Sequence, residues 1–122
     1  MGKSANDALP DAYLNEIKDN ATLMIACSAE PTTRTEAVTT YALADVAVVS
    51  GDFTLGNGDV SGRKLAVAAK SAVAIDTSGT ATHVAIVDGT RLLFVTTCTS
   101  IALVDTGTVN FPTWDIEVAD PT

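Results

Sequence analysis

Residues 78–98, SGTATHVAIVDGTRLLFVTTC, indicate the fold more directly than any other part of the chain. Their first half is mainly apolar and β-branched, which favours an extended strand. In such a strand, residues 82, 84 and 86 lie on one face and residues 83, 85 and 87 on the other. A second β-branched run follows Asp88-Gly89, a dipeptide that suits the positive φ values of a type I′ turn. The stretch therefore predicts a β-hairpin with a tight two-residue turn.

This hairpin contains His83, the one histidine of the chain. We interpret His83 as a structural residue, partly exposed or hydrogen-bonded, because it lies mid-strand among small apolar neighbours. Nucleophilic catalysis needs a base beside Ser, Thr or Cys, and both cysteines lie in apolar runs that raise a thiol pKa. Asp115 and Glu117 share an outward strand face, where solvation is the ordinary role of a carboxylate. We therefore predict no enzymatic activity, no catalytic residues and no cofactor.

The composition supports a single domain built mainly of strands. The chain has 122 residues, of which 47% are apolar but only 5% aromatic, so the core must consist of small, β-branched side chains. That mixture favours strands over helices. Strand-like runs separated by turn signals at intervals of about 8–12 residues are typical of a sandwich or barrel. The prediction is an antiparallel β-sandwich or barrel-like domain over residues 1–122, with strands between residues 22 and 118.

One helix is predicted, over residues 7–20. Leu9, Tyr13 and Ile17 recur at helical spacing and form an apolar stripe, while Asp7 is a suitable N-cap and Asn20 a suitable end. The stripe could pack against the sheet of its own chain or against a neighbouring subunit, and the sequence leaves both open.

Several strand boundaries are also predicted. Residues 45–49 form a strand, and residues 65–69 and 72–75 form two strands or one strand interrupted at residues 70–71. A turn follows at residues 105–107. The last run, residues 114–118, alternates cleanly, which places Trp114 toward the interior.

The charge of the chain excludes several kinds of partner. The net charge is −8 and the seven basic residues are scattered, so the chain lacks the basic stripe that nucleic acid or anionic lipid would need. No apolar run approaches the roughly 20 residues of a membrane helix. We expect no nucleic-acid partner and no membrane association.

The sequence contains only weak signals for a metal or redox site. Cys27 and Cys98 are far apart in sequence and form no CxxC motif, so we expect two buried free thiols, or a disulfide if their strands are neighbours. The loop at residues 56–64 begins like a calcium loop, but Ala68 stands where a bidentate glutamate is required. The sequence therefore predicts no metal site.

The chain nevertheless resembles a group of known proteins over residues 8–121. The segments that carry the resemblance are YLNEIKDNATLMIACSAEPTT (13–33), SGRKLAVAAKSAVAID (61–76), SGTATHVAIVDGTRLLFVTT (78–97) and FPTWDIEVADPT (111–122). They are similar to small structural proteins of tailed bacteriophages and prophages. The resemblance implies a capsid decoration, or cement, protein that is made in the host cytoplasm. It would bind the major capsid protein on the outer surface of the head, commonly as a homotrimer.

Two other classes of function remain open. A tail, baseplate, receptor-binding or carbohydrate-binding module would need exposed aromatic platforms, and a small cellular β-sandwich module would need a concave polar site. For the decoration protein, we expect contacts with the shell or between subunits from residues 1–20 or from the loop at residues 56–64. The candidate contact residues are Leu9, Tyr13, Ile17, Arg63 and Lys64.

Overall fold

The computed structural model describes residues 8–57 and 63–118. The chain is mainly β with antiparallel pairing and one N-terminal α-helix, which confirms the predicted fold class. The elements in chain order are α1 (Ala8–Asn20), β1 (Leu23–Cys27), the short π-helical segment η1 (Glu36–Thr40), β2 (Ala42–Ala47), the 3₁₀ turn η2 (Ser50–Asp52), β3 (Phe53–Asn57), β4 (Arg63–Val67), β5 (Lys70–Ala74), β6 (Gly79–Val87), β7 (Leu92–Leu103), β8 (Thr108–Phe111) and β9 (Trp114–Val118).

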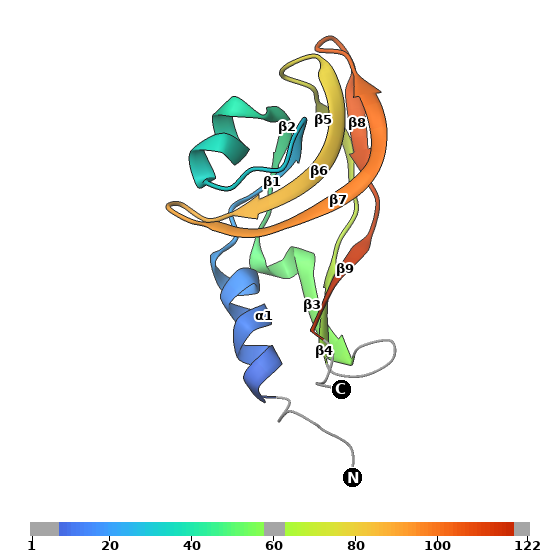
Figure 1. The fold of residues 1–122 in the computed structure, drawn as a ribbon. Helices are drawn as coiled ribbons and strands as arrows, with labels where there is room; N and C mark the ends of the chain where they lie inside the picture. Colours follow the sequence, from blue (N-terminus) through green and yellow to red (C-terminus); the bar gives the residue numbers. More distant parts are fainter. Residues whose placement is uncertain (1–7, 58–62, 119–122) are drawn as a thin grey trace.

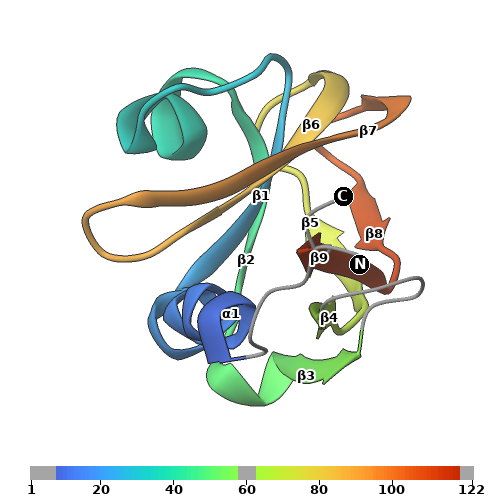
Figure 2. The ribbon, with the colours of Figure 1, turned by 60° about the horizontal axis from the view of Figure 1, so that its bottom comes forward.

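The strands form three antiparallel groups around a common core (Figures 1 and 2). A four-stranded sheet has the order β2-β1-β6-β7, a three-stranded sheet the order β3-β4-β9, and β5 pairs with β8. One isolated bridge, between Ala44 and Ile75, links β2 to the segment that follows β5. In Figure 2 the strands run around the core, so the molecule is closer to an open barrel than to two flat sheets.

The centre of the four-stranded sheet is covered on both faces, which explains its nearly continuous apolar sequence. On β1, Met24 and Ala26 face the main core, whereas Ile25 and Cys27 face a second cluster that is closed by Ala37 of η1. The same alternation continues on β6, where the two predicted faces contact these two clusters. The predicted division of residues 82–87 between two faces is therefore confirmed.

One residue of the predicted apolar stripe of α1, Ile17, packs on its own chain. Leu14 and Ile17 are fully buried in the main core, and α1 contacts β3 and β4. Tyr13 remains 46% exposed. The helix begins and ends close to the predicted residues, and of the two packing possibilities the intramolecular one holds for Ile17.

The turn between β6 and β7 differs from the prediction. β6 ends at Val87 and β7 begins at Leu92, so the loop between the strands spans residues 88–91 rather than two residues, and within it Asp88 N–H donates to the Arg91 carbonyl at 3.0 Å. A type I′ turn needs positive φ at both central residues, but neither Asp88 nor Gly89 has a φ in that region. The predicted type I′ turn is wrong because the Asp88 carboxylate organises a wider loop, accepting the backbone N–H groups of Thr90 and Arg91.

Other strands begin or end at residues different from those predicted. The strand predicted at residues 45–49 is β2, which begins and ends earlier, at Ala42–Ala47. The run at residues 65–75 divides at residues 68–69 rather than at 70–71, because β4 and β5 pair in different groups. Residues 92–103 form the single long strand β7, which continues the second strand of the hairpin.

The carboxyls of Asp45 and Asp76 lie close together where β2 runs beside the segment that follows β5. Asp76 N–H donates to the Leu43 carbonyl at 2.7 Å, which brings Asp76 close to Asp45. Partial burial and the facing Asp76 carboxyl raise the pKa of Asp45 above its usual value of 3.8. A carboxyl with a raised pKa binds its proton more tightly in the folded state, so the protein loses stability as the pH rises through the values just above 3.8.

We therefore expect Asp45→Asn to stabilise the protein at neutral pH. The gain should be no more than about 0.5 kcal/mol, because Asp45 keeps most of its contact with water, which screens the repulsion. It should disappear below the usual pKa of aspartate, where the carboxyl is protonated in both folded and unfolded chains. Thermal unfolding of the two proteins at neutral and acidic pH measures this, and an equal gain at both pH values would contradict it.

Candidate functional site

Strands β7 and β8 face each other across a gap and do not pair. Among the described residues, β7 pairs only with β6, and β8 pairs only with β5. A turn joins the two strands, in which Gly107 N–H donates to the Val104 carbonyl and Asp105 N–H donates to Ser78 Oγ. Beyond this turn the strands separate, as Figure 1 shows. We call the gap between residues 96–104 and residues 108–115 the open seam.

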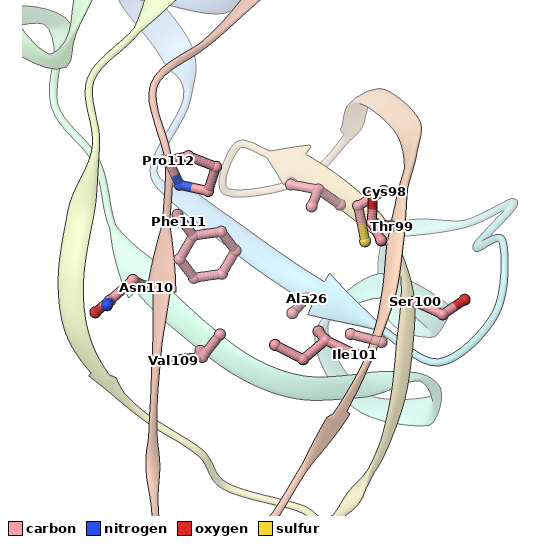
Figure 3. A pocket seen from close by; sticks show the side chains of 11 residues that line it. Ala26, Cys98, Thr99, Ser100, Ile101, Val109, Asn110, Phe111 and Pro112 are labelled. Atoms are coloured by element: carbon pink, nitrogen blue, oxygen red, sulfur yellow. The ribbon is translucent and has the colours of Figure 1, made fainter.

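A cavity of about 360 Å³ occupies the middle of the open seam. In Figure 3, Phe111 and Ile101 point into it from opposite sides, and Ala26 of β1 lies at its floor. Ser100 and Asn110 point away from it, and Asn110 Oδ1 accepts the Ala72 N–H of β5 at 2.8 Å. The side chains that face the cavity are therefore mainly apolar.

Two further hollows extend this cavity along the same seam. One of about 310 Å³ shares Cys98, Phe111 and Pro112 with the first and reaches Trp114. The other, of about 450 Å³, shares Ile101 and lies near the turn between β7 and β8. Neighbouring hollows share lining residues, so the three lie next to one another along the open seam, and we call them together the groove.

Trp114 borders the groove at its β9 end. Its ring stacks on Phe94 with centroids 5.9 Å apart, and it packs against the main core, so the predicted inward orientation is confirmed. The indole Nε1 is buried and has no hydrogen-bond partner among the described residues. A buried donor without an acceptor costs free energy that an acceptor from a partner or from water would recover.

The two cysteines differ in exposure. Cys27 is buried, and burial, with the Cys98 thiol nearby, raises its pKa to about 11. Cys98 is only partly buried and lines the open seam, and partial burial raises its pKa by desolvation. Both thiols are free. The prediction of two buried thiols is therefore wrong for Cys98, because β7 is an edge strand with one side open.

This difference predicts selective labelling. In the folded protein at mildly alkaline pH, we expect a maleimide to modify Cys98 and to leave Cys27 unmodified, because thiolate and access are both required. In denaturant both should react. Intact-mass spectrometry and peptide mapping measure the result, and the variant Cys98→Ser provides the control, since it should lose labelling in the folded state. Rapid modification of Cys27 in the folded protein would contradict the prediction.

The candidate contact residues lie elsewhere in the fold. Ile17 is 1% exposed and belongs to the core of its own chain, so its side chain is not available to a partner. Tyr13 is exposed, while the side chain of Leu9 lies outside the described part. Arg63 and Lys64 are partly buried on β4, and Lys64 Nζ lies 3.5 Å from Asp115 Oδ2. Packing of α1 on β4 brings these two elements together, but none of the described candidates lines the open seam.

Sequence reasoning missed the open seam, although one signal was present. Residues 92–103 contain no charged side chain, which is unusual for an edge strand that faces water. Alternation alone could not show which strand would be left at the edge.

The remaining features that the sequence analysis considered are the histidine, a possible metal site and a possible membrane helix. His83 is partly exposed, and its Nδ1 lies 2.8 Å from Thr82 Oγ1. Within residues 8–57 and 63–118, no group of three or more His, Cys, Asp or Glu residues is placed to hold a metal ion. The calcium-like loop falls largely on residues 58–62, outside the described part. None of the described helices has the length and apolar character needed to span a membrane.

No family model, curated protein or solved structure matches this chain.

Proposed function

We propose that this chain is a virion structural protein that decorates the outer surface of a tailed-phage head. In this proposal the partner is the major capsid protein, the chain acts as a homotrimer, and it has no enzymatic activity, cofactor, nucleic-acid partner or membrane association. It is made in the host cytoplasm and becomes part of the virion. The observation that supports a binding role most directly is the open seam, an apolar groove beside unpaired strand edges, which is a surface that protein partners cover.

The charge of the chain is compatible with this location. A net charge of −8 would be repelled by packaged DNA inside the shell but is tolerated on its outer surface. Stabilisation then follows from linkage, because a ligand that binds only the assembled lattice lowers the free energy of that lattice. Three linked subunits would add avidity without new types of contact.

The proposal is tested by removing and restoring the protein. Heads purified from a phage strain that lacks the gene should bind the purified chain in co-sedimentation, and electron cryo-microscopy should show added density outside the shell. Restored heads should also resist heat or loss of divalent cations better than bare heads. Density on the tail, or no binding to heads, would overturn the proposal.

The alternative is a tail, baseplate, receptor-binding or carbohydrate-binding module. Trp114 and Asp115 both line the hollow at one end of the open seam, but Trp114 packs inward on Phe94 and Asp115 lies beside Lys64, so this end offers less of an aromatic platform than that function needs. If the alternative held, the same microscopy would place the protein on the tail, and binding to host-surface glycans would depend on Trp114.

A further inference from the structure

We infer that the open seam binds an extended segment of the shell protein, which adds to the edge of β7 as a further strand. This inference rests on the proposed decoration function and specifies how the chain would bind its partner. The shell segment would donate and accept backbone hydrogen bonds along β7 and place alternate side chains in the groove.

The edge of β7 is the first observation in favour. β7 spans Leu92–Leu103, is the outermost strand of its sheet, and carries no charged residue. Soluble proteins normally protect a long edge strand with lysine, proline or a covering element, because unpaired backbone groups recruit other strands. Pro112 follows β8 on the other side of the gap, whereas the edge of β7 has no proline. The edge most open to pairing is therefore that of β7.

The groove beside this edge has a shape and chemistry that suit an extended segment. It follows residues 96–104, which correspond to about 30 Å of strand at roughly 3.3 Å per residue. Phe111 and Ile101 face each other across it, as Figure 3 shows, so alternate apolar side chains of an added strand would find apolar neighbours. At one end, the buried Nε1 of Trp114 lacks an acceptor, which a peptide carbonyl would supply.

A second copy of this chain does not fit the groove equally well. A strand lying between β7 and β8 must be free of its own sheet on both sides. Every strand in residues 8–57 and 63–118 already pairs along at least one edge. An extended segment that belongs to no sheet fits the gap better than any of these strands, and in the proposed function the shell protein supplies it.

The charges near the groove define that segment further. None of the residues that line the three hollows is basic, and Asp115 is the one acidic residue among them. Asp105 lies in the turn at the other end, and the chain carries −8 overall. An acidic segment would be repelled. The partner segment should therefore carry small apolar residues at alternate positions, few or no acidic residues, and neutral or basic flanks.

The test uses one substitution in the groove and one matched control. Ile101 and Val49 are 50% and 64% exposed, so aspartate at either position should leave the fold intact, as circular dichroism would verify. Val49 lines none of the three hollows. We expect Ile101→Asp to weaken binding to heads that lack the protein by at least about tenfold, because a carboxylate would be buried against apolar groups. Val49→Asp should bind like the unmodified protein.

Two measurements on the unmodified protein make the test independent of the variant. In the head-bound state, maleimide labelling of Cys98 should fall at least about tenfold below that of the free protein, because the added strand covers the thiol. Hydrogen exchange of the β7 backbone amides should also slow on binding, since a new ladder protects them. Protection of β7 in the free protein, rising with concentration, would identify a second copy as the occupant and overturn the inference.

The outcomes separate the two levels of the proposal. If heads bind the protein but Ile101→Asp binds equally well and Cys98 stays reactive, the open seam is not the contact and the decoration function survives. If heads do not bind the protein at all, the proposed function fails and the inference fails with it. Loss of binding by Ile101→Asp alone, with protection of Cys98 and β7, supports both.

Discussion

Replacing Leu65 by alanine is expected to lower the free energy of unfolding by about 2–5 kcal/mol. Leu65 has no exposed surface and lies on β4, the central strand of the three-stranded sheet. Its register partners are Leu55 on β3 and Ile116 on β9, and α1 packs against β4. Removing the side chain would leave a cavity enclosed by two neighbouring strands and a helix, which cannot easily collapse.

Equilibrium unfolding in urea measures this effect as a lower midpoint at an unchanged slope. Leu55→Ala is the matched control, because Leu55 lies directly across from Leu65 but is only partly buried. Its cost should be clearly smaller, since fewer apolar contacts are lost. Equal costs for the two variants would mean that α1 and β4 do not form a closed layer.

Replacing Asp88 by alanine should lower the melting temperature by several degrees. Asp88 is 7% exposed, and its carboxylate accepts the backbone N–H of Thr90 at 2.7 Å and the Nε–H of Arg91 at 2.6 Å. Arg91 in turn donates to Glu16 of α1 at 2.9 Å, and Arg34 Nε donates to the Asp88 carbonyl at 2.7 Å. Without this carboxylate, donors that shape the turn lose their acceptor, and the hairpin loses an anchor to the helix.

The same carboxylate should make stability depend on acidic pH. Hydrogen bonds from the Thr90 N–H and from Arg91 lower the pKa of Asp88 to about 2, compared with its usual 3.8. A lowered pKa means that the folded state holds its proton more weakly, so this stabilisation is present above 3.8 and is lost as the pH falls toward about 2. Asp88→Asn should therefore melt below the unmodified protein at neutral pH, and the difference should shrink across that range. A constant difference would show that the charge of Asp88 contributes nothing.

Part of the fold was predictable because burial follows local alternation. The two faces of residues 82–87 contact two different apolar clusters, as their spacing requires, and the helix begins and ends close to the expected residues. Turn residues such as 105–107 also lie where their composition indicates. These features depend on neighbours within a few positions, which the sequence presents directly.

The candidate contacts were less predictable. An amphipathic helix shows that Ile17 must be buried, but spacing does not say against which chain. The type I′ turn failed because the Asp88 carboxylate binds two backbone N–H groups and widens the loop, a choice that depends on Arg91 and Glu16 as well as on the dipeptide. Cys98 was expected to be buried because it follows an apolar run, yet the side of β7 on which it lies faces an open gap.

Local periodicity and composition are therefore enough to predict the strand-rich core of small residues, the N-terminal helix and the alternation of residues 82–87 between two faces. Which strand lies at an edge depends instead on pairings between strands that are far apart in the sequence. β7 and β8 are joined by a short turn, yet each pairs with a different partner, β6 and β5, and so the two separate. The open seam results from these long-range pairings, which no local pattern in the sequence encodes.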